Sequence, residues 1–177
     1  MLFKKTLIAA AMFAFSGLAT TMAATNPATS TFNVLLKINS ACTVSTTGDV
    51  DFGNADSNTT GDLTKNATNI SVKCSKNTAY TIGLKPSNNT LLGAGSMAAQ
   101  NVAPVTGNTD TVPYALYQDS SFATVWGDTA STNRKTGTLD TTGNVAKTYT
   151  VYAKVLGTNL NVTPDSYKDV VTVSVYY

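Results

Sequence analysis

The chain contains no histidine and no glutamate, and its ten acidic residues are all aspartate. An enzyme needs a positioned acid, base or nucleophile of tuned pKa. Without histidine, the Ser–His and Cys–His pairs of many hydrolases cannot form within one chain, and zinc lacks its usual ligands. We therefore expect a protein that is not an enzyme, with no catalytic residues, no metal site and no cofactor.

Two aspartates come closest to an exception. Asp49 and Asp51 in "GDVDFG" lie two residues apart, so they would share one face of a strand. As a catalytic pair or as calcium ligands they lack the rest of a metal-loop signature. We expect both carboxylates to be solvated residues of a turn.

Charge of either sign is also scarce. The chain has 12 basic and 10 acidic residues, and Lys4 and Lys5 lie at its very start. The remainder is neutral and has no strong basic patch of the kind that binds nucleic acid. We expect no nucleic-acid partner.

The first 24 residues read as a signal peptide. Lys4 and Lys5 precede an apolar run over residues 6–19, and small residues at Ala23 and Ala24 offer a cleavage point. The run is shorter than the roughly 20 apolar residues that cross a bilayer, and no later segment is longer. The sequence predicts an exported protein that begins near residue 25.

The chain has only two cysteines, Cys42 and Cys74. An isolated pair in an exported protein most often forms a disulfide, and two buried free thiols are the alternative. A bridge across this separation would stabilise the fold by roughly 3–4 kcal/mol on the chain-entropy model.

Segments rich in β-branched and aromatic residues recur between clusters of Gly, Asn, Asp, Ser and Thr. After an opening segment at 32–38 they are "DVDFG" (49–53), "NISVKC" (69–74), "AYTIGL" (79–84), "VPYALYQD" (112–119), "FATVWGD" (122–128), "AKTYTVYAKVLG" (146–157) and "YKDVVTVSVYY" (167–177). The best helical candidate, 91–103, is weakened by its glycines. We predict an all-β fold, an antiparallel sandwich of immunoglobulin type, with a closed barrel as the alternative.

The two ends of the chain carry the clearest period-2 patterns. Apolar residues alternate in the opening segment at Phe32, Val34, Leu36 and Ile38, with Leu35 out of phase. In the last segment Val171, Val173, Val175 and Tyr177 share one face, and the sequence stops there. We expect the last segment to be a strand central to the core, beside which one further strand is missing.

These pieces together resemble a known family. The alternating segment that leads into "INSACTV", followed in order by "VDFGN", "NISVKC", "YTIGL", "PYALYQD" and "YKDVVTVSVYY", resembles the spore coat protein U domain. The resemblance is closer still to the Csu-type major pilin subunits of archaic chaperone–usher pili, and it spans essentially all of residues 25–177.

The resemblance implies an incomplete immunoglobulin-like sandwich that lacks its last strand and is completed by a donor strand from a neighbouring subunit. It divides the chain into a signal peptide (1–24), an N-terminal donor-strand extension (25–40) and a pilin domain (41–177). The implied donor residues are Phe32, Val34, Leu36 and Ile38, although part of "LKINSAC" could instead belong to the domain's own first strand. The implied acceptor groove and chaperone contact comprise Val171, Val173, Val175, Tyr176 and Tyr177, and the two tyrosines could equally just finish a core strand.

The implied function is that of a structural subunit of a surface pilus, exported through the periplasm and polymerising head-to-tail by donor-strand exchange to support adhesion and biofilm growth. Implied partners are identical subunits in a fibre, a periplasmic chaperone, an outer-membrane usher, and tip or adaptor pilins. A minor adaptor pilin, a spore-coat structural protein and a secreted carbohydrate-binding module are the alternatives. Trp126 could serve the last of these by stacking on a sugar, but we expect it in the core.

Overall fold

The structure is a computed structural model that describes residues 26–87 and 92–177, without the side chains of residues 67 and 68. The predicted signal peptide lies outside the described residues. The chain divides into two units, Met1–Lys37 and Ile38–Tyr177. In the first unit, described from residue 26, the backbone has no strand or helix.

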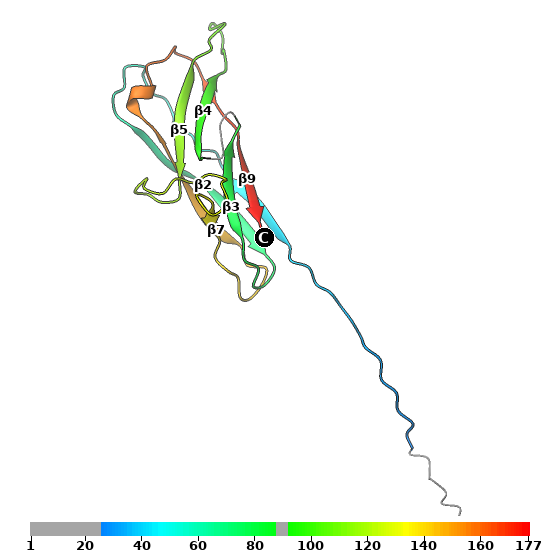
Figure 1. Cartoon of the computed structure of the whole chain (residues 1–177). Helices are drawn as coiled ribbons and strands as arrows, with labels where there is room; N and C mark the ends of the chain where they lie inside the picture. Colours follow the sequence, from blue (N-terminus) through cyan, green and yellow to red (C-terminus); the bar gives the residue numbers. More distant parts are fainter. Residues whose placement is uncertain (1–25, 88–91) are drawn as a thin grey trace, which may run out of the picture. The chain divides into compact units, whose positions relative to one another are not determined.

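The second unit is an antiparallel β-sandwich of two sheets (Figure 1). One sheet has the strand order β1-β2-β7-β5-β4-β8 and the other the order β6-β3-β9. The elements are β1 (Cys42–Thr47), β2 (Leu63–Cys74), β3 (Thr81–Pro86), β4 (Ala94–Ala99), β5 (Thr111–Tyr117), β6 (Lys135–Thr136), β7 (Lys147–Val155), the 3-10 helix η1 (Gly157–Asn159), β8 (Tyr167–Lys168) and β9 (Val171–Tyr176). The prediction of an all-β, immunoglobulin-like fold is confirmed.

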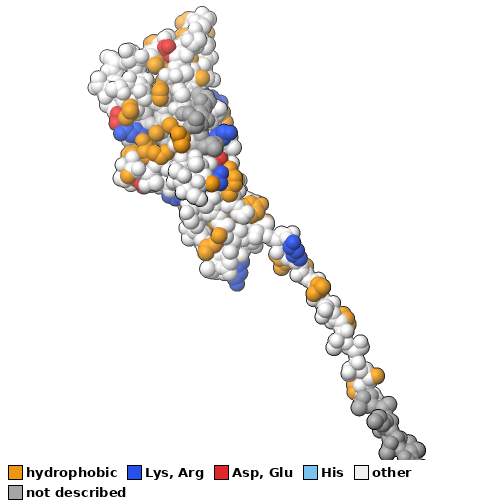
Figure 2. Space-filling view, in the orientation of Figure 1, with side chains coloured by type: hydrophobic (Ala, Val, Ile, Leu, Met, Phe, Trp, Pro, Cys, Tyr) orange, Lys and Arg blue, Asp and Glu red, His pale blue; other side chains and the backbone are white. Residues whose placement is uncertain are grey.

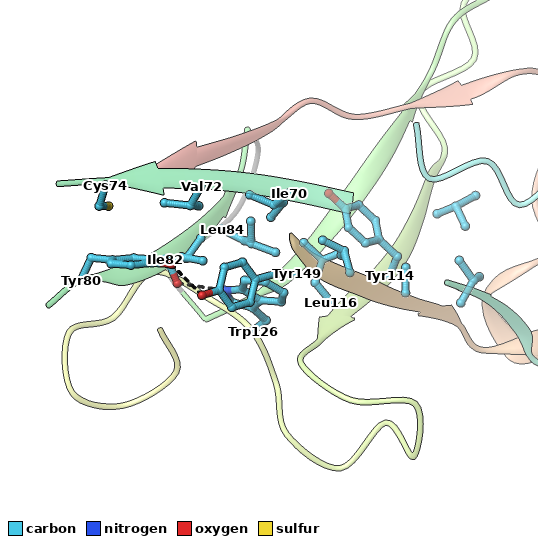
Figure 3. Packing of buried hydrophobic residues seen from close by; sticks show 14 of the residues in the cluster. Ile70, Val72, Cys74, Tyr80, Ile82, Leu84, Tyr114, Leu116, Trp126 and Tyr149 are labelled. Atoms are coloured by element: carbon cyan, nitrogen blue, oxygen red, sulfur yellow. Dashed lines mark hydrogen bonds between the residues drawn. The ribbon is translucent and has the colours of Figure 1, made fainter. Parts of the chain in front are cut away.

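The core lies between the sheets and is built from alternate residues of the long strands (Figure 3). Successive side chains of a strand point to opposite faces, so a period-2 sequence buries one set and exposes the other. The buried apolar residues are Ile70, Val72, Cys74, Tyr80, Ile82, Leu84, Val112, Tyr114, Leu116, Trp126, Tyr149, Val151, Ala153, Val155 and Leu160.

Four aromatic side chains of the core carry polar atoms, and each polar atom is paired; Tyr114 donates to Asp169. The Trp126 side chain is fully buried, and its Nε1 donates to the Ile82 carbonyl at 2.9 Å. The hydroxyls of Tyr80 and Tyr149 hydrogen-bond at 2.7 Å (Figure 3). Burial of Trp126 confirms the expectation that it is a core residue.

Several predicted elements differ from the structure. Residues 49–53 and 122–128 form no strand apart from one bridge between Val125 and Tyr117. In 122–128 the chain instead turns around the Asp119 carboxylate, which accepts from the Thr124 amide at 2.9 Å. The helical candidate at 91–103 contains β4, because pairing with β5 outweighs its weak helical propensity. The last predicted segment is split at residues 169–170 into β8 and β9.

The sequence predicts a last strand that packs on the core and has one further strand missing beside it. In the structure β9 is an edge strand that pairs with β3 alone among the described strands (Figure 1), and Val171, Val173 and Val175 pack against the core. At the edge of the other sheet, β1 pairs with β2 alone. Each of these edges leaves main-chain groups outside any ladder of the described residues.

No helix among the described residues is long and apolar enough to span a membrane.

Candidate functional site

An open groove of about 600 Å³ reaches from the surface into the sandwich core beside β9. It is lined by residues of both sheets and of the loop that follows β1. The lining residues are Thr46, Gly48, Asp49, Val50, Asp51, Phe52, Ile70, Leu84, Met97, Gln100, Tyr114, Leu116, Val151, Ser166, Tyr167, Lys168, Asp169, Val171 and Val173.

The floor of the groove is core. Ile70, Leu84, Leu116 and Val151 line it, although almost none of their surface reaches solvent. Higher on the walls, other apolar side chains are only half-buried, among them Val50, Phe52, Met97, Val171 and Val173. Apolar side chains that are exposed beside the core mark a place where another apolar element can pack.

The edge strand β1 shows the same lack of cover. Val44 pairs with Val72 in the ladder, so both side chains lie on the same face of the sheet. Val72 is fully buried, whereas Val44 is 41% exposed. Every residue of β1 after Cys42 is exposed. The sandwich therefore covers the inner face of β2 but not that of its outermost neighbour.

A disulfide joins Cys42 to Cys74, which face each other across β1 and β2. This confirms the predicted bridge. The residue before it is held as well, because the Ser75 amide donates to the Ala41 carbonyl at 2.9 Å and the Ala41 amide donates to Ser75 Oγ at 3.0 Å. The segment that precedes β1 is therefore anchored at its C-terminal end.

The predicted donor residues precede this anchor and have no secondary structure. Phe32, Val34, Leu36 and Ile38 are each more than 80% exposed. Figure 2 shows apolar side chains uncovered at intervals along residues 26–37. Such a run of large exposed apolar side chains is unusual unless a partner covers it.

The predicted residues of the last strand fall on two faces. Val171, Val173 and Val175 are half-buried on the inner face, and the first two line the groove. Tyr176 points to the outer face, where its hydroxyl donates to Asp128 Oδ2 at 2.9 Å. Tyr177 is 62% exposed. The structure thus brings the valines into the groove and gives Tyr176 a partner within its own chain.

Sequence reasoning missed the residues that hold Tyr176. Arg134 stacks on its ring at 3.5 Å and donates from Nε to Asp128 Oδ1 at 2.8 Å. Asp128 is buried and lies against Gly83, where a Cβ would collide with the carboxylate. Asp128 and Arg134 have no periodic signal in the sequence, and only their opposite charges could have pointed to them.

Two polar features flank the groove. Tyr114 lines it and donates to Asp169 Oδ2 at 2.7 Å, and burial, with this carboxylate nearby, raises the pKa of the Tyr114 hydroxyl. Asp49 and Asp51 are exposed, and Asp51 Oδ1 accepts from the Gly53 amide at 2.8 Å, as expected for a carboxylate in a turn. Within residues 26–87 and 92–177, no group of three His, Cys, Asp or Glu side chains could hold a metal ion.

The fold and the groove define a class of protein, an immunoglobulin-like sandwich with an opening into its core. The model of the Spore Coat Protein U domain family matches residues 28–174, and the chain belongs to this family. A comparison with curated proteins finds no match.

One similar solved structure is the crystal structure of the CsuC–CsuE chaperone–tip adhesion subunit pre-assembly complex from archaic chaperone–usher Csu pili of Acinetobacter baumannii. The identity is 22% and the TM-score 0.50, over 79% of this chain. The match covers 40% of the solved chain, so this chain spans less than half of the length of the protein it resembles. This likeness concerns the fold.

Proposed function

We propose that this protein is a structural subunit of a chaperone–usher pilus that joins copies of itself by strand donation. The N-terminal segment of one copy lies in the open groove of the next, along the free edge of β9. The observation that carries the proposal is that one chain holds both an uncovered apolar groove and an exposed apolar segment with strand periodicity.

The groove and the N-terminal segment are both apolar, and the segment has the periodicity of a strand. A strand added to a sheet edge gains main-chain hydrogen bonds, and its alternate side chains fill pockets below. Burial of Phe32, Val34, Leu36 and Ile38 would contribute roughly 6–12 kcal/mol gross at each junction. Each ladder hydrogen bond adds about 1 kcal/mol net. These gains oppose the entropy cost of association and of ordering the segment.

The contact is head-to-tail, so repetition produces an open fibre instead of a closed oligomer. The disulfide and the Ala41–Ser75 hydrogen bonds hold the base of the donor segment, and so they would carry tension from one subunit to the next. One chain carries both the donor segment and the acceptor groove, which is what a repeating rod subunit needs. A minor adaptor subunit with both features is the nearest alternative.

Before assembly the groove needs temporary cover, since exposed apolar edges promote aggregation. We assign that task to a periplasmic chaperone, with the usher as the site of exchange and the cell surface as the destination. The family membership and the chaperone complex of the similar solved structure support this part of the proposal. A carbohydrate-binding role draws no support from Trp126, whose side chain is fully buried.

A single pair of variants tests the donor assignment. Leu36→Asp places a charge on the face that enters the groove and should abolish fibre formation. Leu35→Asp makes the same change one residue earlier, on the opposite face of the strand, and should leave fibres nearly unchanged. Fibres are counted by electron microscopy of cells that express the subunit together with its chaperone and usher. Normal fibres with Leu36→Asp would reject the donor assignment.

A further inference from the structure

The loop after β1 forms one wall of the groove and has features that the proposed function does not use. Between Gly48 and Gly53 the residues alternate: Val50 and Phe52 are half-buried against the core, and Asp49 and Asp51 are exposed. This is strand periodicity in a segment that has no strand partner among the described residues. We call Gly48–Gly53 the recognition wall.

The glycines at its two ends are required by backbone conformation and not by space. Gly48 has φ +74° and Gly53 φ +75°, and a Cβ at either position would meet nothing within 4 Å. A positive φ is accessible to glycine at little cost. The chain therefore leaves β1 and enters the next loop through two left-handed residues, which hold Val50 and Phe52 toward the groove.

The charge of this wall matches that of the N-terminal segment. Residues 26–41 carry one charged side chain, Lys37, between the apolar Leu36 and Ile38. The charged residues that line the groove are Asp49, Asp51, Lys168 and Asp169. Asp169 already accepts from Tyr114 and Ser87. Asp49 and Asp51 are thus the carboxylates with exposed surface available to an incoming cation.

We propose that the recognition wall selects the N-terminal segment of a second copy of this chain. Val50 and Phe52 pack on its apolar side chains while Asp49 and Asp51 face its Lys37. The inference rests on the proposed function and adds to it the residues that set specificity and register. The wall lines the same groove as Val171 and Val173, and the proposed placement puts the C-terminal end of the bound segment at the start of β9.

The test is a charge swap measured as binding of a labelled synthetic peptide, residues 28–40, to the full chain by fluorescence anisotropy. The Lys37→Asp peptide should bind the wild-type chain about three- to tenfold more weakly, since one exposed pair contributes about two- to fivefold and reversal adds repulsion. The chain with Asp49→Lys and Asp51→Lys should reverse this preference. In about 1 M salt, where the screening length falls to about 3 Å, both preferences should disappear.

Two controls test whether the position of the charge matters; the first keeps the net charge of the peptide constant. A peptide with Lys37→Asn and Asn33→Lys moves the charge along the same face and should lose the preference for the wild-type wall. A chain with Asp56→Lys changes a carboxylate that does not line the groove and should bind like the wild type. Thermal melts of every chain variant confirm that it is folded.

The possible outcomes separate the two proposals. If the wild-type peptide does not bind, the proposed function fails and this inference fails with it. If the peptide binds, but Lys37→Asp weakens binding equally to the wild-type and swapped chains, strand donation stands and the recognition wall is rejected. A reversal of preference between the two chains supports the wall.

Discussion

The hydroxyl of Tyr176 donates to Asp128 Oδ2 at 2.9 Å, and this bond ties the end of β9 to the loop that follows Trp126. Arg134 adds a stacking contact on the Tyr176 ring and an ion pair to the same carboxylate. Because β9 has hydrogen bonds to β3 alone among the described strands, these side chains supply what a second neighbouring strand would otherwise provide.

Tyr176→Phe keeps the ring under Arg134 and removes only the hydroxyl. We expect the free energy of unfolding to fall by about 0.5–1.5 kcal/mol. Relative to the wild type, amide hydrogen exchange should become faster in β9 and stay unchanged in β7. Urea unfolding and exchange mass spectrometry measure the two effects. Tyr177→Phe, at an exposed position, is the matched control and should be neutral. Equal effects of the two variants would contradict a role for the Asp128 bond.

Gly83→Ala should displace Asp128, because the new Cβ would overlap the Asp128 carboxylate. The displaced carboxylate would lose both Arg134 and Tyr176, so we expect a loss of about 1–3 kcal/mol from the buried polar groups left unpaired. Gly61→Ala is the control, since nothing lies within 4 Å of its Cβ. Thermal melts compare the two, and a Gly83→Ala protein as stable as the control would show that this loop adapts freely.

Removal of the disulfide by Cys42→Ala with Cys74→Ala should lower the free energy of unfolding by about 3–4 kcal/mol, for a separation of 32 residues. The reason is the loop-closure entropy that the bridge removes from the unfolded chain. Urea titrations with and without reductant measure the change. The reductant should lower the free energy of unfolding of the wild type and leave that of the double variant unchanged. If reduction of the disulfide leaves the wild type equally stable, the bridge makes no such contribution.

Acid should destabilise the protein through aspartates that accept hydrogen bonds in loops. The Val145 amide lowers the pKa of Asp140, and the Ser121 side chain and Thr124 amide lower that of Asp119. A carboxylate with a lowered pKa stabilises the fold above the ordinary value near 4, and this stability is lost as the pH falls through its folded pKa.

We therefore expect the melting temperature to be level from about pH 7 to pH 5 and to fall progressively below about pH 4. Asp140→Asn should lower the melting temperature at pH 7 and make the decline toward pH 2 shallower. Calorimetry at a series of pH values tests both statements. A decline of unchanged steepness in the variant would assign acid sensitivity to other groups.

Some strands could be predicted from the sequence pattern alone and others could not. The segments that became β2, β5 and β7 alternate regularly and lie inside the larger sheet, so periodicity and burial agree. Residues 49–53 alternate just as well but form no strand, because an alternating pattern needs a hydrogen-bonding neighbour that the described chain does not supply. In 122–128 the hydrogen bonds to Asp119 outweigh the β propensity of Val125 and Trp126.

The same contrast applies to the candidate site. The valines of β9 could be predicted from the period-2 pattern of apolar residues. The bridge between Cys42 and Cys74 could be predicted because the chain has only two cysteines. Asp128, Arg134 and Gly83 could not be, because they meet only when the loop after Trp126 folds across β3 and β9.

By itself the sequence determined that this protein is a β-sandwich with apolar alternation at both ends of the chain, because side-chain periodicity is a local property of a strand. Only the tertiary structure decided that β9 pairs with β3 and that the loop after β1 lines the groove. Strand order and uncovered surface depend on which segments pair across long sequence distances, and that pairing is selected by the packing of the whole core.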